Sequence, residues 1–225
     1  QCSAYAALSD IAEVMLVGHA NSSDDYCIAI RGTKARKMHT SRRDTFRPIN
    51  DLPLAKISSQ GKLEIVNKDH KKKDTSIQVN EDTAFENKVA LIKYYPGANP
   101  EILDFLTDKK YKGIVIEGTG LGHVAASESK LSWLPAIKRA LGEKITVCIA
   151  PQTLYGRLNP LVYSPGRELA KLGVIHCEDM LPEVAYVKLG WVLGHTQNEE
   201  EVKHLMLTNI AGEINRNISE RAFLY

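Results

Sequence analysis

The sequence predicts an α/β protein whose carboxyl-terminal part is built on a parallel sheet. Four short strand-like runs, VALIKYY, GIVIEG, TVCIA and GVIHCED, follow one another after residue 88. Helix-like segments at residues 100–109, 131–141 and 165–172 separate these runs. Strands that alternate with helices in this way form parallel sheets with right-handed crossovers.

The amino-terminal part follows a different pattern. Between residues 10 and 32, the runs IAEVMLVG and YCIAIRG flank the polar turn NSSDD, which predicts two strands joined by a tight connection. Around the lysine-rich stretch 68–74, short alternating runs predict a connector. We therefore expect the end of one domain at residues 1–55, a connector at 56–87 and an α/β domain at 88–225. Two closing helices, at residues 182–194 and 199–215, should cover one face of the second sheet.

Composition excludes several classes of protein. The 225 residues are 44% hydrophobic and 25% charged, which is typical of a globular chain. With 29 basic and 27 acidic residues, no global field attracts nucleic acid or an anionic membrane. No apolar stretch approaches the roughly 20 residues of a membrane helix, and the cysteines form no CxxC pair, so we expect a cytoplasmic protein without a membrane partner. The chain starts at Gln1, and CSAYAAL resembles the last turns of a helix, which predicts a piece of a longer protein.

A glycine-rich loop follows the run GIVIEG. Its glycines are at positions 118, 120 and 122, and His123 follows them directly. A dinucleotide-binding fingerprint requires its third glycine at position 123, so the match to a nucleotide loop is poor. The other interpretation is a tight turn that needs positive backbone φ angles.

Two further loops follow strand-like runs, where open parallel sheets bind ligands. APQTLYGRLNP carries polar side chains that could bind a ligand or satisfy the turn itself: Gln152, Thr153 and Tyr155. HCEDMLPE carries possible metal ligands: His176, Cys177, Glu178 and Asp179. Adjacent residues of an extended chain point to opposite faces, so these four cannot converge on one ion. A core cysteine with helix-capping acids is the interpretation we favour, and we expect no metal.

Basic residues are concentrated at positions 31–47, RGTKARKMHTSRRDTFR, where Asp44 is the one acid. Such a cluster can bind phosphates, or it can be a solvated face. A lysine beside a hydroxyl in a desolvated pocket has a third use, because its pKa falls and it can accept a nucleophile's proton. Composition does not choose among the three.

The order of the motifs along the chain resembles the bacterial-type asparaginase family. Within it, KMHTSRRDTF, EGTGLGHV, CEDMLPE and WVLGHT are most similar to the D-subunit family of tRNA-dependent amidotransferases. The resemblance implies an asparaginase-like α/β fold, in which this chain holds the remainder of a larger amino-terminal domain and a smaller carboxyl-terminal parallel-sheet domain. It also implies a homodimer whose active sites are completed by the neighbouring subunit.

The chemistry that this resemblance implies is acyl transfer to a threonine. A threonine from a TGGT-like loop attacks the side-chain amide, while a TDT-like motif and a lysine manage the proton. Lys37 matches the lysine of the family pattern K-x-x-T-x-x-x-D-T-F, with the other positions in register: Thr40, Asp44, Thr45 and Phe46. His123 matches a residue that reaches into the partner subunit's substrate pocket. The alternatives are a surface base for Lys37 and a loop histidine paired with a carboxylate for His123.

The chain contains neither a TGGT-like loop nor a TDT-like motif before Lys37. We therefore expect these 225 residues alone not to hydrolyse glutamine, whereas the parent protein should release ammonia from it. The resemblance implies that the amidotransferase E subunit uses this ammonia, with ATP and Mg²⁺, to amidate glutamate on tRNA(Gln), and that it binds most of the tRNA. No cofactor is expected in this chain. A free-standing L-asparaginase and a non-catalytic tRNA-binding or assembly module, using bases at 31–47 and 68–73, remain alternatives.

Overall fold

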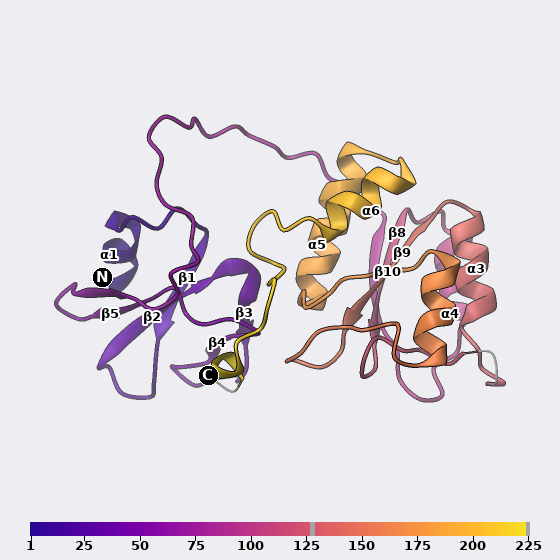
Figure 1. Ribbon diagram of the computed structural model, residues 1–225, viewed down its shortest axis with the longest axis horizontal. Helices are drawn as coiled ribbons and strands as arrows, with labels where there is room; N and C mark the ends of the chain where they lie inside the picture. Colours follow the sequence, from indigo (N-terminus) through magenta and orange to yellow (C-terminus); the bar gives the residue numbers. More distant parts are fainter. Residues whose placement is uncertain (127–128, 224–225) are drawn as a thin grey trace. The chain divides into compact units, whose positions relative to one another are not determined.

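The computed structural model, which describes residues 1–126 and 129–223, divides into two compact units (Figure 1). The first unit comprises Gln1–Glu81 and Asn215–Tyr225, and the second comprises Asp82–Ile214. This division differs from the expected one in two places. Strands β5 (Ala55–Ser58) and β6 (Leu63–Ile65), which fall in the expected connector, belong to the first unit's sheet. The final segment also joins the first unit, where the Asn215 side-chain amide donates to the Asn50 carbonyl at 2.6 Å.

The first unit is an antiparallel sheet packed against a short helix. Its strand order is β1-β2-β5-β6, with β1 (Met15–His19) and β2 (Tyr26–Arg31) forming the hairpin that the sequence predicts. Helix α1 (Cys2–Leu8) packs on this sheet through an apolar cluster that includes Ala6, Ile11 and Ile57. On the other face, Ile28 and Ile30 are buried. The sheet has an apolar cluster on each face because successive side chains of β2 point to opposite faces.

A second, smaller sheet belongs to the same unit. After the 3₁₀ turn η1 (Gly32–Lys34), strands β3 (Ala35–Lys37) and β4 (Phe46–Pro48) pair antiparallel. A further 3₁₀ turn, η2 (Glu220–Ala222), lies near the end of the chain.

The second unit is a four-stranded parallel sheet, as the sequence predicts, and its strand order is β10-β9-β8-β7. The strands are β7 (Val89–Lys93), β8 (Gly113–Gly118), β9 (Thr146–Pro151) and β10 (Ile175–His176). Helices α2 (Glu101–Asp108), α3 (Leu134–Gly142) and α4 (Ser164–Leu172) cover one face. Helices α5 (Pro182–His195) and α6 (Glu199–Leu207) cover the other (Figure 1). The chain therefore combines an antiparallel-sheet unit with a parallel-sheet α/β unit, as the sequence predicts.

The WVLGHT motif lies on α5, where the chain at residues 82–86 packs against it. Gly190 and Gly194 have no side chain, and a Cβ on Gly190 would lie 2.2 Å from the Phe85 ring. The Glu86 amide donates to the Gly190 carbonyl at 2.9 Å, and His195 Nε2 lies 2.7 Å from Asp82 Oδ1. These glycines thus permit the close approach of the segment that enters the second unit. Among the described residues, we find no helix with the length and apolar character needed to cross a bilayer.

Candidate functional site

Lys37 lies at the loop end of the β3–β4 hairpin. It is the register partner of Phe46, so the motif K-x-x-T-x-x-x-D-T-F forms the two strand ends and the loop between them. The Lys37 and Thr40 side chains are exposed, whereas Asp44 and Thr45 are buried. The hairpin therefore presents the lysine outward and uses the later motif residues for its own packing.

Hydrogen bonds within the loop fix the base from which Lys37 projects. The Met38 amide donates to the Thr45 carbonyl at 2.7 Å, and the Thr45 hydroxyl donates to the His39 carbonyl. His39 Nδ1 accepts from the amides of Ser41 and Arg42, both at 3.1 Å. Because these bonds satisfy the loop's polar groups, the backbone beside Lys37 is held in one geometry.

Asp44 joins two arginines of the basic cluster. Its carboxylate accepts from Arg42 Nε at 2.8 Å and from Arg47 Nη2 at 2.6 Å, while its own side chain is only 3% exposed. The hydrogen bond from Arg42 is the largest influence, and it helps lower the pKa of Asp44 to about 2. This motif aspartate is thus ionised at neutral pH and holds the loop.

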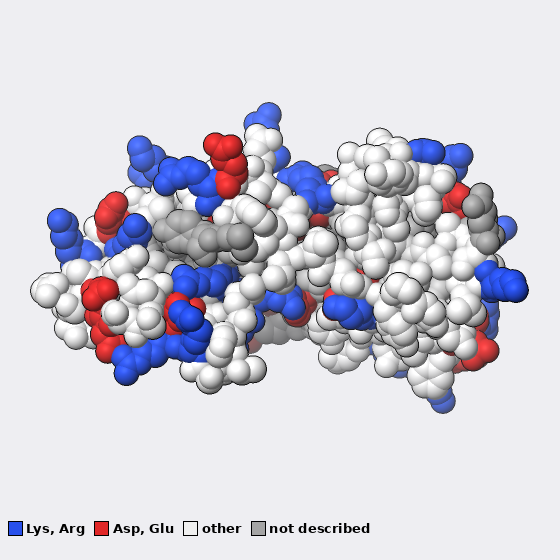
Figure 2. Space-filling view, turned by 90° about the horizontal axis from the view of Figure 1, so that it is seen from below, with Lys and Arg blue, Asp and Glu red and all other residues white. Residues whose placement is uncertain are grey.

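Two further arginines of the cluster, Arg43 and Arg31, are also paired. Arg43 Nη1 lies 2.5 Å from Asp24 Oδ2, and Arg31 is buried between Glu13 and Asp51. On the face shown in Figure 2, Lys and Arg side chains are scattered with Asp and Glu among them. A phosphate-binding surface requires cations that are not already neutralised, so this pairing argues against that interpretation of the cluster.

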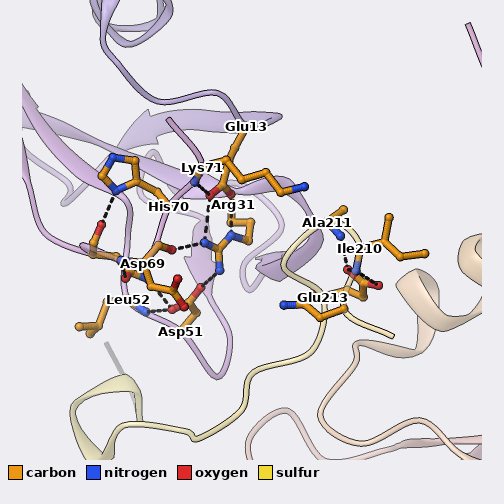
Figure 3. Close-up of polar contacts among 12 residues, drawn as sticks. Glu13, Arg31, Asp51, Leu52, Asp69, His70, Lys71, Ile210, Ala211 and Glu213 are labelled. Atoms are coloured by element: carbon orange, nitrogen blue, oxygen red, sulfur yellow. Dashed lines mark hydrogen bonds and ion pairs between the residues drawn. The ribbon is translucent and has the colours of Figure 1, made fainter. Parts of the chain in front are cut away.

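Arg31 is the centre of a buried ion network (Figure 3). Its guanidinium reaches Glu13 at 2.6 and 3.0 Å, Asp51 at 2.9 Å and the Asp69 carbonyl at 2.5 Å. Burial would raise the pKa of Glu13, but hydrogen bonds from Arg31 and from the Lys71 amide lower it below its ordinary value. Burial raises the pKa of Asp51 despite the attraction to Arg31. Arg31 therefore holds residues 67–71 against the first sheet.

The glycine loop of the second unit is the tight turn that the sequence allowed. Gly120 has a φ of 52° and Gly122 a φ of 98°, a region that side chains with a Cβ rarely adopt. The amide of Thr119 donates to the His123 carbonyl and the amide of His123 donates to the Thr119 carbonyl, both at 2.9 Å. The loop therefore closes on itself and fixes the backbone of His123 at the carboxyl end of β8.

His123 is half-buried, and its ring meets the edge of Tyr163 at a centroid distance of 5.5 Å. Burial lowers the pKa of His123. Its Nε2 has no hydrogen-bond partner among the residues that the structure describes. The alternative of a histidine paired with a carboxylate thus finds no support in the described part of the chain.

His176 is the last residue of β10. From the sequence it was a candidate only as a metal ligand. Its Cδ2 would be 3.3 Å from a Cβ on Gly122, so it packs on the glycine loop. Burial and the nearby charge of His123 lower the pKa of His176 to about 4, although a backbone hydrogen bond at Val174 opposes this shift. Because parallel strands end at the same edge, the position of His176 after the fourth strand was the signal that could have placed it beside the glycine loop.

The other loop candidates have structural partners. The Gln152 side chain donates to the Tyr94 carbonyl at 2.6 Å, so it satisfies the backbone. Cys177 is fully buried in the core, as expected. The acids that follow it do not cap α5 as expected, because no side chain forms an N-terminal capping hydrogen bond with this helix. Instead, Glu178 and Asp179 face Arg157 at 2.8 and 3.6 Å. Among the described residues, no group of three or more His, Cys, Asp or Glu side chains is placed to hold a metal ion.

The low pKa of His176 predicts that stability falls at mildly acidic pH. The folded protein keeps the imidazole neutral down to a pKa of about 4, whereas the unfolded chain protonates it near its ordinary value of 6.5. This contribution is therefore complete above pH 6.5 and is lost as pH falls toward 4. At about pH 5, the loss relative to neutral pH should be roughly 2 kcal/mol.

Urea unfolding of wild type and His176→Gln at about pH 7.5 and about pH 5 measures this loss. Glutamine cannot take up a proton, so the variant should show a smaller fall in unfolding free energy between the two conditions. Equal falls in both proteins would contradict the assignment to His176.

Comparison with known proteins places both units in one family. The glutaminase/asparaginase C-terminal domain matches residues 88–206, and the asparaginase N-terminal domain matches residues 1–71. Among solved structures, the chain is similar to the thermostable L-asparaginase from Thermococcus kodakarensis, with a TM-score of 0.75 and 29% identity over 84% of this chain and 56% of that one. L-asparaginase I from Vibrio cholerae gives a TM-score of 0.71 and 26% identity over 84% and 55% of the two chains.

Sequence relatives are more similar still. The glutamyl-tRNA(Gln) amidotransferase D subunit of Pyrococcus abyssi is 59% identical over 95% of this chain and 47% of its own length. The corresponding D subunit of Methanothermobacter thermautotrophicus is 48% identical over 97% of this chain and 49% of its own length. The chain thus spans about half the length of the curated relatives that it matches. With both domain models matched in order, the chain belongs to the glutaminase/asparaginase family.

Proposed function

We propose that this chain is the carboxyl-terminal part of a D subunit that hydrolyses glutamine and supplies ammonia to a tRNA-dependent amidotransferase. The observation that carries the proposal is the 59% identity to an amidotransferase D subunit across 95% of the chain. Identity to the L-asparaginase of Thermococcus kodakarensis is only 29%. The difference favours the amidotransferase over a free-standing L-asparaginase.

In this proposal the reaction is acyl transfer from the glutamine amide to a threonine. The nucleophilic threonine would come from sequence outside these 225 residues, and Lys37 would take its proton, directly or through a neighbouring group. The internally hydrogen-bonded hairpin supports this role because it fixes the backbone from which Lys37 projects. In this proposal, sequence outside these 225 residues covers the exposed lysine side chain.

The remaining parts of the proposal concern the assembly. Ammonia would pass to the E subunit, which would use ATP and Mg²⁺ to amidate glutamate on tRNA(Gln) and would bind most of the tRNA. His123, in the glycine loop after β8, would contact the substrate in a neighbouring copy of a homodimer. The ion pairs of Arg42, Arg43 and Arg47 disfavour the alternative of a tRNA-binding module.

Transfer of an isotope label tests the proposal. With the full-length protein, the E subunit, ATP and Glu-tRNA(Gln), the amide ¹⁵N of glutamine should appear in tRNA-bound glutamine. We expect asparagine, which is one methylene shorter, to be a poorer donor by about 10-fold to 200-fold in kcat/KM. Efficient asparagine hydrolysis without the E subunit, and no label on the tRNA, would instead identify a free-standing L-asparaginase.

A further inference from the structure

Two thiols of the first unit converge although they come from different elements. Cys2 is the first residue of α1 and Cys27 is the second residue of β2. The Cys2 thiol lies 4.0 Å from the Ile57 carbonyl, and Ile57 is the register partner of Cys27 on the neighbouring strand. Both cysteine side chains pack in the apolar cluster between α1 and the first sheet. Both remain free thiols in this structure.

Small reagents can reach this pair. Cys2 and Cys27 line one surface cavity of about 480 Å³, together with residues that include Asp24 and Arg43. Both cysteines are half-buried rather than enclosed. The cavity therefore gives a low-molecular-weight oxidant access to either sulfur.

The surroundings of Cys27 favour a lasting bond over a rapidly exchanging one. Burial, followed by the hydrogen bond with Cys2, raises the pKa of Cys27 to about 11. A thiol with a high pKa is a poor leaving group, so a disulfide that contains it is reduced slowly. The same property makes oxidation slow, because few thiolates are present at neutral pH.

We propose that Cys2 and Cys27 form a disulfide that ties α1 to the sheet of the first unit. In the reaction, two S–H bonds break and one S–S bond forms, while a small-molecule disulfide takes up two electrons and two protons and leaves as two thiols. The bond would close the chain segment between residues 2 and 27, which includes the whole of β1. Closing a loop of this length stabilises the folded state by restricting the unfolded chain.

The second unit contains a matched control pair. Cys177 also lies close to Cys148, since its amide donates to the carbonyl of the adjacent Ile149 at 2.8 Å, but both cysteines are fully buried in the apolar core beneath α5. Their proximity resembles that of Cys2 and Cys27, whereas their access to solvent does not. We therefore expect an external oxidant to link the first pair and to leave the second pair reduced.

Disulfide mapping of the full-length protein tests the proposal. The protein is incubated with glutathione disulfide, its free thiols are alkylated after unfolding, and its peptides are analysed by mass spectrometry. The expected product is a linked Cys2–Cys27 peptide, with Cys148 and Cys177 both alkylated. Oxidation should also raise the Tm by roughly 5–10 °C.

Variants separate this bond from other effects of oxidation. Cys27→Ser and Cys2→Ser should each abolish the rise in Tm, whereas Cys148→Ser should retain it. If one serine variant does not fold, the other gives the same answer. Complete alkylation of Cys2 and Cys27 after oxidation, or a link from either to another cysteine, would overturn the proposal. Neither the peptide mapping nor the Tm depends on glutamine hydrolysis, so this test is independent of the proposed function.

Discussion

Replacing Lys37 by methionine in the full-length protein is expected to reduce kcat for glutamine hydrolysis by about 10²-fold to 10⁴-fold. Methionine keeps much of the length and volume of the lysine stem but cannot accept or hold a proton. The side chain is exposed at the end of the hairpin, so its loss removes no buried contact of the first unit. The folded structure should persist, and Tm should change by only a few degrees at most.

Lys62→Met is the matched control for this experiment. Lys62 is an exposed lysine of the same unit, in the turn before β6, and lies outside the K-x-x-T-x-x-x-D-T-F pattern. Its replacement should leave kcat within about two-fold of wild type. If Lys37→Met is as active as this control, Lys37 does not take the proton of the nucleophilic threonine and its proposed catalytic role is refuted.

The second large effect is expected from Arg31→Met, which should lower the free energy of unfolding by about 3–5 kcal/mol at neutral pH. The variant leaves two buried carboxylates without their cation, since the side chains of Glu13 and Asp51 are only 7% and 10% exposed. It also removes the donor to the Asp69 carbonyl. Denaturant unfolding followed by circular dichroism measures the loss.

Two comparisons make this prediction specific. Arg43→Met breaks an ion pair whose side chains are 59% and 62% exposed, so it should cost less than about 1 kcal/mol. The loss of unfolding free energy caused by Arg31→Met should also be smaller at acidic pH. Without the guanidinium, the folded-state pKa values of Glu13 and Asp51 rise, so protonation of both carboxyls relieves the folded state as pH falls. A defect that is independent of pH, or equal to that of Arg43→Met, would argue against the network.

Local patterns predicted much of this protein. The alternation of apolar runs and helical segments after residue 88 predicted the parallel sheet, and the runs around NSSDD predicted the β1–β2 hairpin. Helix α6 ends at Leu207 rather than near residue 215, because Glu213 closes a loop by accepting from the Ile210 and Ala211 amides. Glu213 also forms a buried ion pair with Lys188, at 2.5 Å. This contact joins residues that are distant in sequence, and helical periodicity carries no information about such contacts.

Residue order over short spans was enough to predict most strands and helices, the family resemblance and the place of Lys37 in its motif, because each of these depends on neighbouring residues. Only the tertiary structure decided which charges are neutralised and which polar groups lack partners. The basic cluster is ambiguous as a string of letters, but the fold brings Asp24 and Glu13, which are distant in sequence, to its arginines. Likewise, His176 meets the glycine loop because parallel strands end at one edge of the sheet. Each of these pairings joins elements whose approach depends on the packing of the whole unit.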